Sequence, residues 1–276
     1  MSDIGAAVER LVEVMRRLRA PDGCPWDKEQ DLLSLRPYLV EETYEVLDEM
    51  DRVGYGGPWK PFAEELGDLL FQIVFHAQLA SEKGEFTLAD VANAIAEKLE
   101  RRHPHVFGTE RLHGAEQVLQ NWAKLKADER IAKTGKAGSV LDGVPTAAPA
   151  LQRAERLTEK ASRIGFDWPD LKGVKAKIDE ELKELDEAIE SKDRLAIEHE
   201  LGDVLFAIAN LGRKLNTPSE DALRGTNKRF TSRFHRVEEK LLAAGIPFGE
   251  ASLEVMDRFW DEAKAEEKAA KAAHRP

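Results

Sequence analysis

The sequence Glu-Leu-Gly-Asp-Leu-Leu-Phe, from Glu65 to Phe71, returns almost unchanged as Glu-Leu-Gly-Asp-Val-Leu-Phe, from Glu200 to Phe206. A shorter acidic box of the form Glu-Glu-x-x-Glu precedes each copy. The offset between the copies is 139 positions at the box (Glu42 to Glu181) and 135 positions at the longer motif (Glu65 to Glu200). A repeat of this length is too long for a solenoid unit, so the sequence predicts two tandem copies of one domain.

The fold class follows from the hydrophobic pattern between the turn signals. Apolar residues recur at three- and four-residue spacing in nearly every segment, with no convincing alternation of period two, which predicts an all-α protein with two helical-bundle domains. The expected helices cover residues 4–20, 32–52, 59–82, 88–102, 116–134, 151–164, 174–190, 194–215, 218–244 and 252–273. Residues 135–150 are rich in Gly, Pro and Ala and are expected to link an N-terminal domain (1–134) to a C-terminal domain (151–276).

Several helix ends carry their own signals. Thr87 with Asp90, and Thr217 with Glu220, match the capping-box pattern, in which a hydroxyl and an acidic side chain satisfy free backbone N–H groups. Gly84 and Gly245 stand where a left-handed residue commonly ends a helix. These four features fix the expected starts and ends of helices around each copy of the repeat.

The acidic residues of each copy fall at helical spacing, so their carboxylates point in one direction. Two such helices laid antiparallel would gather four carboxylates around one point, and oxygen-only ligands of this kind suit Mg²⁺ or Mn²⁺. The alternative is a solvated acidic helix face, because 52 of the 276 residues are acidic. Repetition of both boxes in the same context favours the metal site. The residues are Glu41, Glu42, Glu45, Glu65 and Asp68 in the first copy, and Glu180, Glu181, Glu184, Glu200 and Asp203 in the second.

Glycine in the middle of both acidic motifs indicates close packing. Gly67 and Gly202 lie between the two acidic residues of each motif, where glycine costs a helix about 1 kcal/mol relative to alanine. We therefore expect another backbone or a ligand to come close there. The neighbouring apolar positions are expected to face the core: Leu66, Leu69, Leu70 and Ile73 in the first copy, and Leu201, Val204, Leu205 and Ile208 in the second.

Basic residues at helical spacing also recur in both copies. Lys98 and Arg102 are four apart in the first copy, and Arg229 and Arg233 are four apart in the second. Cations facing a metal are what a polyphosphate substrate requires, because they share its negative charge. An ordinary solvated pair is the alternative, and it is less favoured because the pair is repeated. Trp122 and Trp260, each four residues before a lysine, are candidates to stack on a base or to pack in a core.

Composition limits the class of partner and the compartment. With 41 basic and 52 acidic residues the formal charge is −11, which disfavours a nucleic-acid-binding surface. The first helix is charged and amphipathic, and the apolar stretch from residue 69 to 80 is interrupted by polar side chains, so we expect neither a signal peptide nor a membrane span. Cys24 is the only cysteine, which fits a reducing compartment, and cytoplasmic localisation is expected.

Together the motifs resemble the MazG nucleoside triphosphate pyrophosphohydrolases, part of the all-α NTP pyrophosphatase superfamily, over nearly the whole chain. The resemblance rests on the two acidic sets and on the stretches Leu18–Gln30, His103–Gly108 and Arg163–Trp168. It implies two MazG-like domains, each with a four-helix core, and a homodimer whose sites lie between helices of paired domains. It also implies Mg²⁺-dependent cleavage of nucleoside triphosphates between the α and β phosphates, giving a monophosphate and pyrophosphate.

The resemblance also implies roles for individual residues. Arg229 departs from the family pattern, which usually has lysine there, so a point charge becomes a planar fork. Glu41 and Glu180 are expected to orient the attacking water. The implied metal ligands are Glu42, Glu45, Glu65 and Asp68, and Glu181, Glu184, Glu200 and Asp203. The expected substrate-binding residues are Lys98, Arg102 and Trp122, and Lys177, Arg229, Arg233 and Trp260.

Two other functions remain open at this point. The first is a pyrophosphohydrolase narrowed to one nucleotide, such as dUTP or phosphoribosyl-ATP, although the duplication favours an enzyme that accepts many (d)NTPs. The second is a non-catalytic module that binds nucleotide or a partner protein for regulation, and the intact ligand sets of both copies count against it. Neither copy lacks a ligand, and we favour turnover in the C-terminal copy because the N-terminal copy carries an extra Pro/His/Gly-rich segment.

Overall fold

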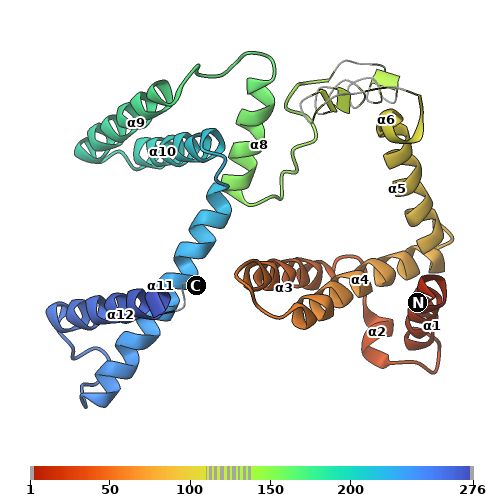
Figure 1. Cartoon of the computed structure of the whole chain (residues 1–276), viewed down its shortest axis with the longest axis horizontal. Coiled ribbons are helices and arrows are strands. Elements are labelled where there is room, and N and C mark those ends of the chain that lie inside the picture. The colour runs from red at the N-terminus through yellow and green to blue at the C-terminus, as the bar shows by residue number, and fades with distance from the viewer. Residues whose placement is uncertain are drawn as a thin grey trace. The chain divides into compact units, whose positions relative to one another are not determined.

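The regular secondary structure of the described residues is entirely helical, which confirms the all-α prediction (Figure 1). The computed structural model describes residues 3–109, 111, 114, 117–118, 121–122, 125, 129, 131–132, 135 and 138–273, with side chains as far as residue 269. The chain divides into two compact units, residues 1–133 and 134–276, and each is considered by itself. The finer limits of the domains and of the linker between them stay a prediction.

Most helices lie where the sequence places them. The first unit contains α1 (Ile4–Leu18), α2 (Pro25–Glu29), α3 (Arg36–Gly54), α4 (Trp59–Glu82), α5 (Leu88–Arg102) and α6 (Pro104–Phe107). The second contains α8 (Ala150–Ser162), α9 (Leu171–Ser191), α10 (Arg194–Lys214), α11 (Ser219–Ala243) and α12 (Leu253–Ala273). The short helices α2 and α6 were not expected. The helix expected over residues 116–134 falls largely outside the described residues.

The helix-end signals are confirmed in the first unit and partly wrong in the second. Thr87 and Asp90 form both hydrogen bonds of a capping box at the start of α5. Gly84 and Gly245 have left-handed φ angles of 71° and 68°. Thr217 does not cap α11, because the helix begins only at Ser219 and Pro218 occupies the capping position without a side-chain bond. The Thr217 hydroxyl instead donates to the Leu215 carbonyl at 3.4 Å.

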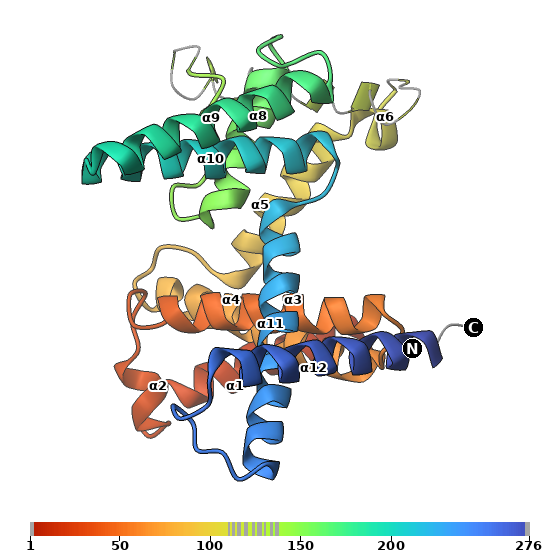
Figure 2. The ribbon, with the colours of Figure 1, turned by 90° about the vertical axis from the view of Figure 1, so that its left-hand side faces the viewer.

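A helical hairpin carries the acidic repeat in each unit. The helices α3 and α4 lie side by side in the first unit, and α9 and α10 lie side by side in the second (Figure 2). The second hairpin is well defined by its ends. Asp170 caps α9 by accepting from two backbone N–H groups, and Asp193 caps α10 in the same way. Lys192 joins the two helices in a left-handed conformation, with φ of 58°. The tight turn places the acidic box of α9 beside the acidic motif of α10.

Each unit contains a buried hydrophobic cluster. In the first unit a buried cluster joins α1 to α4 through Met15, Val74 and Phe75. In the second unit α11 and α12 pack around Val237, Leu241 and Phe259. Within the described ranges, no helix is both long enough and apolar enough to cross a membrane.

The prediction that the apolar positions beside the acidic motifs face the core is largely wrong for the single chain. On α10, Val204 is buried, but Leu201, Leu205 and Ile208 are 48%, 46% and 42% exposed. The equivalent positions of α4 behave alike, with Leu66, Leu70 and Ile73 exposed. The reason is that α10 packs mainly against α8 and α9, which cover only part of its apolar circumference.

Candidate functional site

The C-terminal hairpin gathers three carboxylates into one cluster. Glu181 and Glu184 come from α9 and Glu200 from α10, and one oxygen of each lies within 4.8 Å of the others. Glu181 is only 6% exposed, whereas Glu184 lies open to solvent. Partial loss of solvent around its carboxyl group, followed by the charge of Glu181, raises the pKa of Glu184 above its ordinary value. The cluster therefore concentrates negative charge at the point where the repeat predicts a metal.

A lysine lies directly beside this cluster. The Nζ atom of Lys177 is 2.8 Å from Glu181 and 3.0 Å from Glu180, both on its own helix. Hydrogen bonds to these two carboxylates raise the pKa of Lys177, so its ammonium group is charged throughout the neutral range. Asp203, the fourth expected ligand, lines a cavity of 150 Å³ together with Lys177 and Glu181. The predicted metal ligands and the lysine predicted to bind substrate therefore lie together.

The N-terminal hairpin repeats the carboxylates without the lysine. One oxygen each of Glu42, Glu45 and Glu65 lies within 4.8 Å of the others, from α3 and α4. Burial, followed by the charge of Asp68, raises the pKa of Glu42, and burial, followed by Glu45, raises that of Glu65. All four predicted ligands of this copy thus act on one another electrostatically. Glu41 precedes Glu42 on the exposed side of α3.

Both clusters fit a hard divalent cation. Every predicted ligand atom is a carboxylate oxygen, and after burial, repulsion from the neighbouring carboxylates contributes to the raised pKa values of Glu42 and Glu184. A cation would relieve this repulsion. The absence of sulfur or imidazole from the clusters among the described residues favours Mg²⁺ or Mn²⁺ over zinc.

The predicted phosphate-binding arginines lie away from the carboxylate clusters within the chain. The Arg102 guanidinium is paired with Glu129 at 2.7 Å, and Arg233 is paired with Glu267 of α12 at 2.8 Å. After its contacts with α8 and α10, α11 extends to pair with α12 (Figure 1). Arg233 lies at that pairing, bound to Glu267. The expectation that these cations face the metal ligands is therefore not met by one chain alone. Their neighbours Lys98 and Arg229 lie on the same helices, α5 and α11.

The two tryptophans expected at the base each contact a residue of another helix. The Trp260 ring is 5.2 Å from the Phe230 ring, and the Arg233 guanidinium lies over it at 5.8 Å. The Trp122 indole donates to the Arg102 carbonyl at 2.9 Å. Each tryptophan therefore neighbours a predicted phosphate-binding arginine, and base stacking by either one stays a prediction.

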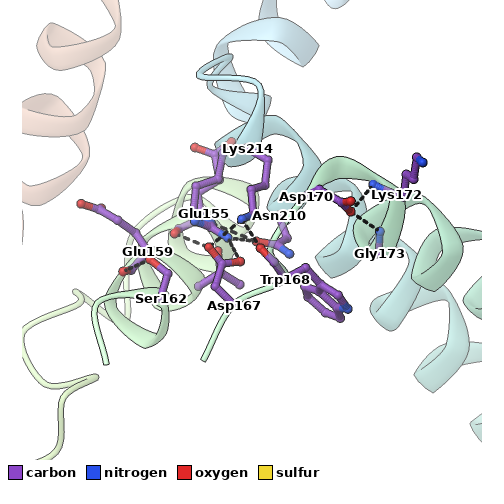
Figure 3. Close-up of polar contacts among 12 residues, drawn as sticks. Glu155, Glu159, Ser162, Asp167, Trp168, Asp170, Lys172, Gly173, Asn210 and Lys214 are labelled. Atoms are coloured by element: carbon purple, nitrogen blue, oxygen red, sulfur yellow. Dashed lines mark hydrogen bonds and ion pairs between the residues drawn. The ribbon is translucent and has the colours of Figure 1, made fainter. Parts of the chain in front are cut away.

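Sequence reasoning missed a second set of residues beside the C-terminal cluster (Figure 3). Trp168 lines the same cavity as Glu181, and Asn210 lines it from α10. Asp167 anchors this segment through ion pairs with Arg213 at 2.7 Å and Lys214 at 2.8 Å. The signals in the sequence were the stretch Arg163–Trp168, which carries part of the resemblance, and the match of Trp168 to Trp26 across the repeat.

Comparison with known proteins agrees with this architecture. The family model of the MazG nucleotide pyrophosphohydrolase domain matches residues 30–107 and 171–237, one segment in each unit. The nucleoside triphosphate pyrophosphohydrolase/pyrophosphatase MazG of Thermotoga maritima is 44% identical over 264 residues, covering 96% of this chain and 98% of that protein. A nucleoside triphosphate pyrophosphohydrolase of Escherichia coli K12 is 43% identical, covering 94% and 98%. The chain therefore belongs to the MazG nucleotide pyrophosphohydrolase family.

Proposed function

We propose that the protein is a Mg²⁺-dependent nucleoside triphosphate pyrophosphohydrolase that converts many (d)NTPs and water to the monophosphate and pyrophosphate, thereby cleaning the nucleotide pool. The observation that carries this proposal is the carboxylate cluster of Glu181, Glu184 and Glu200 with Lys177 against it. Membership of the family, and the printed names of the relatives from Thermotoga maritima and Escherichia coli, support the reaction class. We place this activity in the cytoplasm, which agrees with a chain that has a single cysteine.

The chain's own residues have distinct parts in this reaction. Glu181, Glu184, Glu200 and Asp203 would hold the divalent ion, which would supply charge neutralisation at the α-phosphoryl group and a lowered pKa for the attacking water. Glu180 would accept a hydrogen bond from that water and orient it. Lys177 is already charged. It would break its ion pairs with Glu180 and Glu181 and bind the phosphate oxygens instead. If the N-terminal copy also hydrolyses nucleotides, its set of acidic residues would act in the same way: Glu41, Glu42, Glu45, Glu65 and Asp68.

We further propose that a homodimer completes the site. In one chain Arg229 and Arg233 lie away from the carboxylates, and a Cβ added at Gly202 would have no neighbour within 4 Å. Leu201 and Leu205 flank this glycine and are exposed on the same helix. Covering them with a second chain would bury apolar area worth about 25 cal/mol per Å² and would bring another hairpin to the carboxylates. Leu205→Glu should therefore reduce both dimer mass in light scattering and activity, whereas Leu242→Glu, at an exposed position of α11, should reduce neither.

The first test is the reaction itself. The purified protein is incubated with Mg²⁺ and each of eight common (d)NTPs, and the products are separated. A monophosphate with pyrophosphate from many substrates is the expected result. Turnover of only one nucleotide would replace the broad enzyme with a specialised one. Diphosphate with phosphate would contradict the cleavage position, and no turnover of any substrate would point to a nucleotide-binding regulatory module.

A further inference from the structure

A tryptophan, a lysine and a glutamate recur at fixed spacing near the end of each copy. The pattern Trp-x-x-x-Lys-x-x-Glu covers residues 122–129 in the first copy and residues 260–267 in the second, 138 positions later. The tryptophan and the glutamate are about two helical turns apart, so in the second copy both lie on one face of α12. Neither glutamate belongs to the carboxylate clusters of the described residues. The repeat therefore contains two carboxylates to which the predicted metal sites assign no role.

In both copies this glutamate binds the arginine that the repeat predicts to contact phosphate. Nε of Arg233, on α11, donates to Oε2 of Glu267 at 2.8 Å, and Nη2 lies 2.8 Å from the same oxygen. In the first unit, Nη2 of Arg102 donates to Oε2 of Glu129 at 2.7 Å. The side chains of Arg233 and Glu267 are only 25% and 29% exposed, so their pair is partly shielded from water. Its recurrence indicates that the arginine and the glutamate act as one unit.

We propose that Glu267 is a positioning residue for phosphate binding in the C-terminal copy, because it holds the Arg233 guanidinium in the orientation that receives a phosphate group. The proposal rests on the function proposed above and on the predicted role of Arg233 in it. It adds a residue that touches no substrate and acts through the arginine.

The contacts of Arg233 leave one edge of its guanidinium group for a ligand. A guanidinium has five N–H groups, and it binds phosphate best through two parallel ones on the same edge. Glu267 occupies the edge formed by Nε and Nη2. Among the described residues, no carboxylate binds the edge formed by Nη1 and Nη2. Two N–H groups, one from each Nη atom, therefore remain for two phosphate oxygens.

An aromatic ring supports the same guanidinium from its face. Cζ of Arg233 lies 5.8 Å from the centre of the Trp260 ring, and that ring lies 5.2 Å from Phe230 of α11. The ring limits tilting of the guanidinium plane, and Glu267 limits its rotation within the plane. An arginine that is ordered before the substrate arrives loses less side-chain entropy when it binds.

The second predicted phosphate ligand of this copy, Arg229, is held differently. Its Nη2 donates to Oγ1 of Thr226 at 2.8 Å, and no carboxylate of the described residues pairs with it. Four residues separate Arg229 from Arg233, so both lie on one face of α11. Arg229 therefore keeps its full positive charge, whereas Glu267 offsets part of the charge of Arg233. The pair with Glu267 weakens attraction for phosphate and improves orientation, and the proposal is that orientation has the larger effect.

The first copy divides its carboxylate between two arginines. Oε1 of Glu129 accepts from Nε of Arg101 at 2.9 Å, in addition to the contacts of Glu129 with Arg102. With the offset of 131, Ser232 stands at the position of Arg101 in the second copy. Removing Glu129 would disturb two arginines at once, so the inference is confined to Glu267.

The test removes the charge of Glu267 and keeps the size of its side chain. Glu267→Gln should raise the KM for every (d)NTP by about three- to tenfold, which is the usual effect of one lost hydrogen bond, and change kcat by less than about twofold. Inhibition by inorganic tripolyphosphate should weaken by the same factor, because Arg233 meets the phosphates. The matched control is Glu266→Gln, which removes the neighbouring ion pair between α12 and Lys240 of α11 and should change neither quantity.

A double variant shows whether Glu267 acts through the arginine. In an Arg233→Gln background, Glu267→Gln should raise the KM no further, whereas two independent contributions would add. If Glu267→Gln does not fold by circular dichroism, Glu267→Asp, which keeps the charge but shortens the side chain, should show the same changes at smaller size.

Three results would overturn the proposal. An unchanged KM in folded Glu267→Gln would remove the role, and equal effects in Glu266→Gln would make it a tether between two helices. A lowered KM would show that Glu267 competes with phosphate for Arg233. If the wild-type protein hydrolyses no nucleotide, the proposed function fails, and calorimetry with tripolyphosphate and Mg²⁺ tests Glu267 by itself. Weaker binding by Glu267→Gln than by Glu266→Gln is then expected, and equal binding would contradict the positioning role.

Discussion

The two copies of the acidic hairpin share their carboxylates but differ in the residues around them. The C-terminal cluster has Lys177 bound to Glu181, whereas the offset of 139 places Tyr38 at the equivalent position of the N-terminal copy. Carboxyl pKa values are raised in both clusters, but the charge of Lys177 opposes the rise only at Glu184. Identical predicted metal ligands therefore do not make identical sites, and we expect phosphate binding to depend also on the neighbouring cation.

The largest expected difference between the copies is in turnover. Glu181→Gln should lower kcat/KM by about 100-fold or more, since even the partners of metal ligands are worth ~10–100-fold. Glu42→Gln should lower it less than about twofold, because the N-terminal cluster has no lysine against its carboxylates. Steady-state kinetics with circular dichroism measures both variants, and Glu187→Gln, on the exposed face of α9, is the control. Equal losses in Glu42→Gln and Glu181→Gln would show that both copies turn over.

Lys177 gives the next largest effect. Lys177→Met should raise the KM for nucleoside triphosphates by about tenfold and change kcat less, because a hydrogen bond from a charged group is worth roughly 1.5–3 kcal/mol. Tyr38→Phe in the N-terminal copy should have no effect on either constant. An unchanged KM in Lys177→Met would mean that the lysine only neutralises Glu181 in the ligand-free protein.

The sequence predicted the helices and the carboxylate clusters better than it predicted where the basic side chains lie relative to those clusters. Repeated spacing within one helix is local, so Glu181 with Glu184 followed directly from the sequence, and the α9–α10 turn supplied Glu200. The position of Arg233 depends on the direction in which α11 extends from Ser219, and local spacing does not specify this direction. The sequence did not point to Asn210, because its place in the cavity depends on contacts with Arg213 and on the loop that carries Asp167.

In the metal-free protein, removing one carboxylate should change the free energy of unfolding in opposite directions in the two clusters. Glu42→Gln removes one of several mutually repelling carboxylates and should raise the free energy of unfolding by roughly 0.5 kcal/mol. Glu181→Gln removes the partner of Lys177 and should lower it by about 0.5–1 kcal/mol. Thermal unfolding in EDTA at pH 7 measures both. A stabilised Glu181→Gln variant would mean that repulsion within its cluster outweighs the pair with Lys177.

The smallest expected effect concerns the arginine of the N-terminal copy. Hydrogen bonds from Arg102, and then Arg101, lower the pKa of Glu129 to about 2, from an ordinary value of 4.5. A carboxyl group whose pKa is lowered by folding stabilises the protein above its unfolded pKa and loses this effect as pH falls toward the folded value. Glu129→Gln should thus be less stable than the wild type at pH 7, by less than about 1 kcal/mol because both partners are partly solvated. The difference should shrink between pH 4.5 and 2, whereas Glu85→Gln, an exposed control, should show no difference at any pH. A difference that stays constant as pH falls would show that Glu129 does not hold Arg102, which would then be available to a phosphate, as the sequence predicts for both Arg102 and Arg233.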